Sequence, residues 1–211
     1  MAYSGNICGK IMEKGDDLMQ TNLVEKDYKG KSFEIIDGQV YMMSPVRFTH
    51  AIVAGNIYRI FSNYLKGKKC IAIPDGVKVE VTNIDTGNKN SLVPDCMIVC
   101  DRSKIKNDLI AGAPDLAVEV LSKSTMKIDR TIKKDAYENI GVKEYWIVSA
   151  SDKFIERYLL VDGKYDLENV YYLDEDYENF ADDEGTVLPI TKIKVSLYDD
   201  LYVDLEDVFN F

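Results

Sequence analysis

The sequence has 211 residues, of which 46% are hydrophobic and 29% charged, and its formal net charge is −10. This composition excludes a chain that is disordered over most of its length, and the length suggests one domain, or one domain with an appendage. No stretch approaches about 18 consecutive apolar residues, which excludes an ordinary transmembrane helix. Residues 1–17 also lack an apolar run of signal-peptide length, so we expect a cytoplasmic protein that has no membrane partner.

The acidic residues are concentrated in the C-terminal quarter of the chain. From Asp152 onward there are 17 acidic and 5 basic residues, whereas the preceding part has 19 acidic and 21 basic ones. The densest runs are 174–178 and 182–184. Such runs are typical of a solvated loop, and the functional alternative is a flank that binds a partner or repels a nucleic-acid duplex. The net charge alone therefore does not exclude a nucleic-acid substrate.

The four cysteines lack the paired spacing of a zinc site. Cys96 and Cys100 lie in one strand-like run and point to the same face, but roughly 13 Å apart, which is too far for both to bind one zinc ion. We expect the cysteines to be small buried hydrophobic residues, because disulfide frameworks are rare in a reducing compartment.

Residues 1–30 give weak signals and are expected to be partly loose. The pattern sharpens after them, where apolar runs at 33–36 and 39–43 flank Asp37 and Gly38. An Asp-Gly pair between two such runs is a strong signal for a β-hairpin with a two-residue turn.

His50–Leu65 has apolar residues at three- and four-residue steps, which predicts an amphipathic helix that ends at Gly67. Extended runs follow at 70–73, 77–81 and 96–100, and residues 82–91 predict a turn or loop.

The stretch 115–121 is apolar on both faces apart from its acids, which is typical of a strand that is covered on both sides. A helix capped by Ser124 or Thr125 is predicted to run to about residue 139, and a second buried strand follows at 144–148. The order strand, helix, strand implies two parallel neighbours joined by a crossover. The runs 154–160 and 165–173 predict a C-terminal hairpin or extension.

Glu119 lies between two valines in the most buried predicted strand. Burying an ionised carboxylate there destabilises the fold by roughly several kcal/mol unless the carboxylate is paired or binds a metal. In the next helix, Lys133 shares the inward face with Asp129, Ala136 and Tyr137, so it is placed to meet a carboxylate. The alternative is a lysine whose charged end reaches water along the helix surface.

Asp95 follows a proline at the start of the run 96–100, where a carboxylate can face the same cleft as an acid of a neighbouring strand. Asp115 is roughly 13 Å from Glu119 along one strand and is expected to be a structural acid. Asp95 and Glu119 are therefore the usable pair. Carboxylates are the ligands that Mg²⁺ prefers, and a nearby ammonium group can stabilise charge on a phosphate or orient a water molecule.

Several ordered motifs of the sequence together resemble one known family. They are VPD at 93–95, APDLAVEVLSKST at 113–125, the series Asp129, Lys133 and Tyr137, and GVKEYWIV at 141–148. The upstream FEIIDGQVYMMSP and the helix that begins near His50 match the same pattern. Over roughly residues 31–160 the chain resembles the Uma-type family of predicted restriction endonucleases, within the PD-(D/E)XK nuclease superfamily.

The resemblance implies an α/β (α+β) fold with a restriction-endonuclease-like core, in which a central mixed β-sheet is flanked by helices. The local pattern adds an extra N-terminal hairpin and a C-terminal β extension to this core. We accordingly expect three regions, which are the N-terminal segment 1–30, the core 31–160, and an acidic extension 161–211 that packs on the core.

The resemblance also implies which residues form the site. Asp95 corresponds to the aspartate of the PD motif and Glu119 to the (D/E) position, and these two would bind the metal. The usual lysine two residues after Glu119 is replaced by Leu121, and the family supplies it from the next helix, where it corresponds to Lys133. Lys123, which replaces a proline common in the family, is a less favoured amine.

Glu34 and His50 match further family positions and are candidates to line the same cleft. For Glu34 the alternative is a surface acid of the hairpin. For His50, the single histidine of the chain, it is a helix-start residue with its hydrogen bonds satisfied.

The function expected from these residues is Mg²⁺-dependent (or Mn²⁺-dependent) endonuclease hydrolysis of DNA. The alternative is a nucleic-acid- or protein-binding module that retains the nuclease fold without catalysis, since fold does not dictate function. A structural or assembly protein is a third reading. A homodimer is expected by analogy, because cutting both strands needs two centres. The chain has no evident helix-turn-helix or zinc finger, so a partner protein could select its target.

Overall fold

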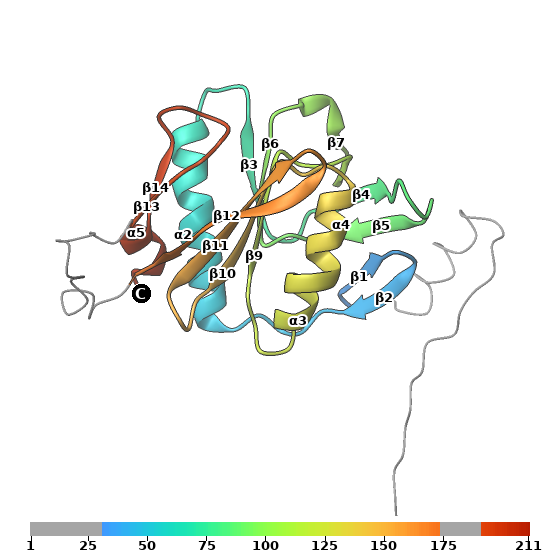
Figure 1. Cartoon of the computed structure of the whole chain (residues 1–211), viewed down its shortest axis with the longest axis horizontal. Helices are drawn as coiled ribbons and strands as arrows, with labels where there is room; N and C mark the ends of the chain where they lie inside the picture. Colours follow the sequence, from blue (N-terminus) through green and yellow to red (C-terminus); the bar gives the residue numbers. More distant parts are fainter. Residues whose placement is uncertain (1–30, 174–190) are drawn as a thin grey trace, which may run out of the picture.

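The structure of the protein is a computed structural model that describes residues 31–173 and 191–211. The predicted loose segment 1–30 and the acidic runs at 174–178 and 182–184 lie outside the described residues. Two six-stranded sheets and a two-stranded ribbon form the molecule, with helices packed beside them (Figure 1). The predicted mixed α/β fold is confirmed, and a second large sheet is present where the sequence suggested one central sheet.

The first sheet has the strand order β2-β1-β5-β4-β8-β7, and the second has the order β12-β11-β10-β9-β6-β3. The strands of the first sheet are β1 (Phe33–Ile36), β2 (Gln39–Met42), β4 (Lys78–Thr82), β5 (Lys89–Leu92), β7 (Ile105–Lys106) and β8 (Leu109–Ala111). The strands of the second sheet are β3 (Ile71–Pro74), β6 (Cys96–Val99), β9 (Leu116–Val120), β10 (Glu144–Ser149), β11 (Phe154–Val161) and β12 (Lys164–Tyr172).

The β1–β2 hairpin turns at Asp37 and Gly38, which both have positive φ angles, 50° and 78°. Two positive φ values in succession are what a tight hairpin turn requires, and Asp-Gly tolerates them well. The predicted hairpin is therefore confirmed, and it places Glu34 of β1 opposite Tyr41 of β2.

The centre of the second sheet is formed by β9 and β10, which are buried over their whole lengths and run parallel, as predicted. Strand β6 pairs with β9 on the other side in the antiparallel direction, and β11 and β12 form the predicted hairpin beyond β10. Side chains of a strand alternate between the two faces, so each central strand contributes to two separate cores.

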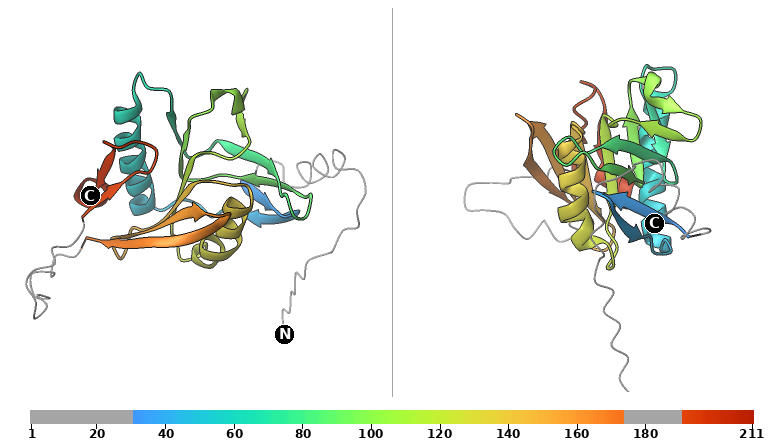
Figure 2. Two further views of the ribbon diagram at one scale, coloured as in Figure 1. Left: turned by 45° about the horizontal axis from the view of Figure 1, so that its top comes forward. Right: turned by 90° about the vertical axis from the view of Figure 1, so that its right-hand side faces the viewer.

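One face of the second sheet packs against α2 (Phe48–Leu65), which begins two residues before the predicted start. Alternate residues such as Val118 and Trp146 meet Ile57 and Phe61 of this helix. The ribbon of β13 (Lys192–Lys194) and β14 (Tyr202–Asp204) and the short α5 (Leu205–Phe209) join the same core beside α2 (Figures 1 and 2).

The opposite face of the second sheet forms the second core. There Ala117 and Ile147 of the central strands contact apolar residues of the first sheet and of the helix that follows β9. The odd-numbered side chains of β6 and β9, from Asp95 to Val99 and from Ala117 to Leu121, point toward this side. This alternation decides that Asp95 and Glu119 enter the same space, between the two sheets.

The sequence predicted one regular α-helix after β9, but the structure has three short helical pieces there. They are α3 (Met126–Ile128), a π-helical turn η2 (Asp129–Lys133) and α4 (Lys134–Asn139). Local hydrophobic spacing does not distinguish a π-turn from an α-helix, since both present an inward face. π-turns inside helices occur frequently at functional sites.

The first sheet contains three strands that the sequence analysis did not predict. Strand β5 includes the polar residues Lys89, Asn90 and Ser91, which were assigned to a loop, and β7 and β8 are only two and three residues long. Strand β5 is stabilised by pairing with β1 and β4, β8 by pairing with β4, and β7 by pairing with β8, and such pairing overrides weak local propensity. In the part of the chain that the structure describes, no helix is long and apolar enough to cross a membrane.

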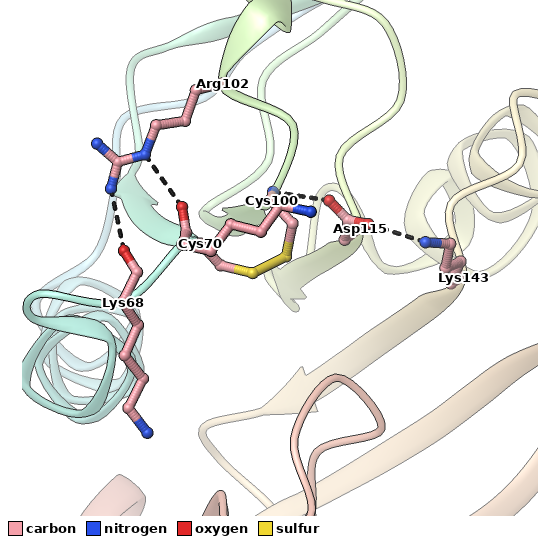
Figure 3. The surroundings of a disulfide bond; sticks show 7 residues. Lys68, Cys70, Cys100, Arg102, Asp115 and Lys143 are labelled. Carbon is pink, nitrogen blue, oxygen red and sulfur yellow. Dashed lines mark hydrogen bonds and ion pairs between the residues drawn. A yellow bond between two sulfur atoms is a disulfide. The ribbon is translucent and has the colours of Figure 1, made fainter.

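The expectation of unpaired cysteines is wrong for two of them. Cys70 and Cys100 form a disulfide at the ends of the antiparallel strands β3 and β6 (Figure 3). Their separation of 30 residues gave no local signal, because only the alignment of the two strands brings them together. Cys96 is a free, fully buried thiol, as expected, and Cys8 lies outside the described residues.

The predicted structural role of Asp115 is confirmed. It accepts a hydrogen bond from the backbone N–H of Cys100 at 2.8 Å and pairs with Lys143 at 3.0 Å (Figure 3). Both contacts hold the Asp115 side chain beside the disulfide, where β6 ends. Asp95 lies at the other end of β6, where the strand begins.

Candidate active site

Asp95 and Glu119 lie side by side across the β6–β9 pair. The register pairs Cys96 with Val118, and the N–H of Asp95 donates to the carbonyl of Val118 at 3.0 Å. Both acids follow directly on this paired stretch, and both line the same cleft. The structure thus brings together the two acids that the sequence selected.

Lys133 reaches these acids from the helical segment after β9. Its Nζ atom lies 3.0 Å from Oε1 of Glu119 and 2.9 Å from Oε2 of Glu34. The side chain is 6% exposed, so the ammonium group does not reach bulk water and the alternative of a solvated lysine is wrong. The inward orientation read from the helix pattern is confirmed.

Glu34 connects the hairpin to the site. Its Oε1 atom accepts a hydrogen bond of 2.7 Å from the N–H of Val93, while Oε2 binds Lys133. The residue is 5% exposed, so it is not a surface acid of the hairpin. Glu119 is held in the same way by two donors, because the hydroxyl of Tyr137 donates to its Oε1 atom at 2.8 Å.

His50 contacts Asp95 from the first turn of α2. Its Nε2 atom lies 2.9 Å from Oδ1 of Asp95, and Oδ2 of Asp95 accepts a hydrogen bond of 2.7 Å from the N–H of Val120. Burial lowers the pKa of His50, but the hydrogen bond and the negative charge of Asp95 outweigh it and raise the pKa above its usual value. His50 therefore orients Asp95 and gives it a titratable partner.

The π-turn adds an acid to which the sequence assigned no role. Asp129 is 2% exposed, and its Oδ1 atom lies 3.8 Å from the Nζ atom of Lys133. The hydroxyl of Tyr145 donates to the carbonyl of Asp129 at 3.0 Å, which fixes the turn against β10. Among the described residues, the Oδ1 atom of Asp129 is one of the few buried side-chain atoms without a hydrogen-bond partner.

The charges of the site shift the pKa values of its acids. Burial raises the pKa of Glu119 well above its usual value, although Lys133 lowers it. Burial likewise raises the pKa of Asp129 to about 6, again against the effect of Lys133. Burial lowers the pKa of Lys133, but Glu119, Glu34 and Asp129 outweigh it and raise the pKa, so the lysine stays charged.

These side chains line one cleft between the hairpin, the start of α2 and the end of β9. The residues after β2, from Met43 to Arg47, and the hydroxyl-bearing Ser122 and Thr125 form its mouth. Asp75, at the end of β3, lies on the same cleft beside His50 and Asp95. Burial and then the charge of Asp95 raise the pKa of Asp75.

The donors present suit a divalent cation that prefers oxygen. Carboxylates outnumber cationic groups in the cleft, and one buried carboxylate oxygen, Oδ1 of Asp129, has no hydrogen-bond partner there. In ranges 31–173 and 191–211, no group of three His, Cys, Asp or Glu side chains is arranged to hold a metal ion, and the ammonium of Lys133 lies among the acids. The chemistry and charge of the residues therefore fit Mg²⁺ or Mn²⁺, and the ammonium group of Lys133 is the positive charge that lies among these acids in the structure.

Comparison with known proteins assigns the chain to a family. The family model described as "Uma2: Putative restriction endonuclease" matches residues 18–186, which is most of the chain. The chain belongs to the Uma2 family. The resemblance found in the sequence is thereby confirmed, and a nuclease-type site is the coarse assignment that membership supports.

Two further proteins are similar to this Uma2 member. The "Uncharacterized protein slr1290" of Synechocystis is 31% identical over 126 residues, which cover 59% of this chain and 64% of that protein. The match thus spans less than two thirds of the relative. A "putative nuclease belonging to DUF820" from Anabaena variabilis shares the fold, with a TM-score of 0.64 at 16% identity over 90% of this chain and 97% of that chain.

All five site residues predicted from the sequence line the cleft, namely Glu34, His50, Asp95, Glu119 and Lys133. Lys123, the less favoured amine, is exposed and does not line the cleft. Two acids were not selected. The inward helical position of Asp129 was a usable signal, whereas Asp75 lies in a turn whose place beside His50 depends on long-range packing.

Proposed function

We propose that this chain is a Mg²⁺- or Mn²⁺-dependent endonuclease that hydrolyses phosphodiester bonds of DNA. Membership of the Uma2 family supports a nuclease with a nucleic-acid substrate, and DNA and the metal are the finer parts of the proposal. The observation that carries it is the convergence of Asp95, Glu119 and Lys133 in one buried cleft.

Asp95 and Glu119 would hold the ion through their carboxylate oxygens. When bound, Mg²⁺ or Mn²⁺ acidifies a water molecule and neutralises charge that grows on the phosphate. The hydroxyl of Tyr137 fixes the rotamer of Glu119, and His50 with the N–H of Val120 fixes Asp95. Both acids are thus preorganised by neighbours whose own positions depend on packed elements.

Lys133 would act on the reacting groups beside the ion. Its Nζ atom is held by Glu34 and Glu119, and the acids around it keep it protonated. A buried ammonium that is already desolvated and oriented stabilises developing negative charge more effectively than one that must leave water. Glu34 then serves as the anchor that keeps the amine in place while Glu119 binds the ion.

Cleavage assays with matched variants test the proposal. Supercoiled plasmid, linear single-stranded DNA and single-stranded RNA are incubated with the protein and Mg²⁺, Mn²⁺ or EDTA. Cleavage of DNA that needs the ion and falls at least about 100-fold in Glu119→Gln is expected, with Asp135→Asn, an exposed change of the same type, as the control. Cleavage that survives Glu119→Gln refutes the site.

A second candidate is a binding module that retains the nuclease fold without turnover. The observation that favours it is the position of Lys133, whose ammonium group already occupies the space among Glu34, Glu119 and Asp129. Calorimetric titration with Mn²⁺ separates the two candidates. A folded protein that binds DNA but shows no heat with Mn²⁺ supports the binding module and contradicts the nuclease.

A further inference from the structure

A buried carboxylate oxygen in the cleft lacks a hydrogen-bond partner. The Oδ1 atom of Asp129 is inaccessible to solvent, and no donor of the described chain reaches it. A buried polar atom without a partner costs about 1–3 kcal/mol, so such atoms are uncommon in native proteins. The position of this one, on the wall of a cleft that contains other acids, indicates a missing cationic partner.

Lys133 does not supply that partner. Its Nζ atom is 2.9 Å from Glu34 and 3.0 Å from Glu119, which are hydrogen-bond distances, but 3.8 Å from Asp129. A contact of 3.8 Å is too long for a hydrogen bond. The ammonium group therefore binds the two glutamates and gives Oδ1 of Asp129 only a weaker electrostatic attraction, while the side chain of Thr125 is hydrogen-bonded to the Asp129 carboxylate.

Asp129 faces the same space as the two proposed ligands. The π-turn directs both Asp129 and Lys133 into the interior, and Asp129 lines the cleft together with Asp95 and Glu119. The negative charges of Asp95 and Glu34 act on Asp129, and the charge of Asp129 acts on Glu119 and His50. The carboxylate of Asp129 thus lines the same cleft as the two proposed ligands, 3.8 Å from the Nζ atom of Lys133.

We propose that Asp129 is a third carboxylate ligand of the divalent cation, beside Asp95 and Glu119. The inference rests on the proposed function, because it concerns the same ion. The cleft contains more acids than Arg47, His50 and Lys133 can neutralise, and a doubly charged ion that prefers oxygen would correct the imbalance. Oxygens of Glu119 and Asp129 would hold the ion, while Lys133 would remain paired with Glu34.

Mn²⁺ affinity, measured by titration calorimetry and electron paramagnetic resonance on the full chain, tests this role without an activity assay. The variants are Asp129→Asn, Asp129→Ala, Glu119→Gln, Asp75→Asn and Asp135→Asn. Asp75→Asn removes a charge from the same cleft at a position that is not a proposed ligand, and Asp135→Asn removes an exposed charge from the same helical segment. Thermal melts in EDTA verify that each variant is folded.

The expected result is a Mn²⁺ affinity that falls about 10- to 100-fold in both Asp129 variants, comparable with the loss in Glu119→Gln. Asp75→Asn should lose only a few-fold, and Asp135→Asn nothing. Water-proton relaxation should also show additional water on Mn²⁺ bound to Asp129→Ala, because a protein ligand has been replaced.

Two results would overturn the inference. Asp129 variants that match Asp75→Asn in affinity, with unchanged hydration of the ion, would show an electrostatic neighbour and not a ligand. In that case Glu119→Gln would still weaken binding, so the proposed nuclease would stand. If the unaltered protein binds no Mn²⁺, both the inference and the metal-dependent function fail together.

Discussion

Glu34 and Glu119 share one counter-ion, since their carboxylates lie 2.9 Å and 3.0 Å from the Nζ atom of Lys133. They come from different sheets, β1 of the first and β9 of the second. The lysine therefore joins the two sheets and the helical segment at the point where the cleft is formed. Because all three side chains are buried, the site and the stability of the fold depend on the same contacts.

Replacing Lys133 by methionine should destabilise the protein by about 3–5 kcal/mol at pH 8, because both glutamates lose their cation inside the protein. The loss should shrink toward pH 5, where protonation of Glu119, whose pKa burial already raises, removes its unpaired charge. Urea unfolding followed by circular dichroism at both pH values measures the change.

Lys127→Met is the matched control for that experiment, because Lys127 is exposed on the same helical segment. It should change the unfolding free energy by no more than about 0.5 kcal/mol. Equal losses in the two lysine variants, or a loss in Lys133→Met that does not depend on pH, would contradict the buried ion-pair cluster.

Asp129→Asn should stabilise the metal-free protein in EDTA. Burial raises the pKa of Asp129 to about 6 in the folded state, so ionised Asp129 disfavours folding at neutral pH. This cost is fully present above about pH 6, decreases as the pH falls toward the unfolded-state value, and is absent at about pH 4. Asparagine removes it, so the gain should be about 3 kcal/mol at pH 8 and close to zero at pH 4.

Thermal melts of Asp129→Asn and the unaltered protein across pH 4–8 provide the measurement. If Asp129→Asn stabilises the metal-free protein and also weakens metal binding, then Asp129 lowers stability in exchange for metal binding. A variant that is less stable at every pH would instead mean that ionised Asp129 supports the fold through Lys133.

The main features of the site could be predicted because they depend on local patterns. Glu119 is conspicuous as an acid in an apolar strand, and Lys133 falls on the inward face of a helical repeat whether the turn is α or π. The pairing of β9 with β10 also follows from the order of buried strands. These inferences need only the periods of a strand and a helix.

The features that were missed depend on contacts between distant segments. The residues Lys89–Leu92 form a strand because β1 and β4 lie on either side of it, and their polar composition concealed this. The same applies to the Cys70–Cys100 disulfide, which follows from the β3–β6 alignment, and to Asp75 at the end of β3. The sequence also did not predict that Oδ1 of Asp129 lacks a hydrogen bond, because no pattern shows that Lys133 contacts the two glutamates more closely than Asp129.

His50 should prove to be a positioning residue for Asp95. His50→Ala removes the 2.9 Å contact and should lower metal-dependent DNA cleavage about 10- to 100-fold. His50→Gln retains a hydrogen-bond donor that does not titrate, so it should recover much of this activity. Because Asp95 raises the pKa of His50 above its usual value, the activity of the unaltered protein should depend on pH above the usual titration range of histidine, and that of His50→Gln should depend on pH less.

Cleavage rates of the two His50 variants between pH 6 and pH 9 measure this difference. A merely structural role for His50 would lower activity in both variants without altering the shape of the pH profile. Equal inactivity of His50→Gln and His50→Ala, with an unchanged profile, would therefore rule out positioning through the hydrogen bond.

The Cys70–Cys100 disulfide should stabilise the fold by about 3 kcal/mol, because it closes a loop across 30 residues of sequence separation in the unfolded chain. It joins β3, the edge strand of the second sheet, to β6, which carries the proposed ligand Asp95 at its start.

Cys70→Ser and Cys100→Ser should each lose this stability, and the double variant should lose no more than either single one. Dithiothreitol should lower the melting temperature of the unaltered protein and leave the double variant unchanged. Equal sensitivity of both proteins to dithiothreitol, or additive losses in the two single variants, would mean that the two cysteines contribute only as buried apolar side chains.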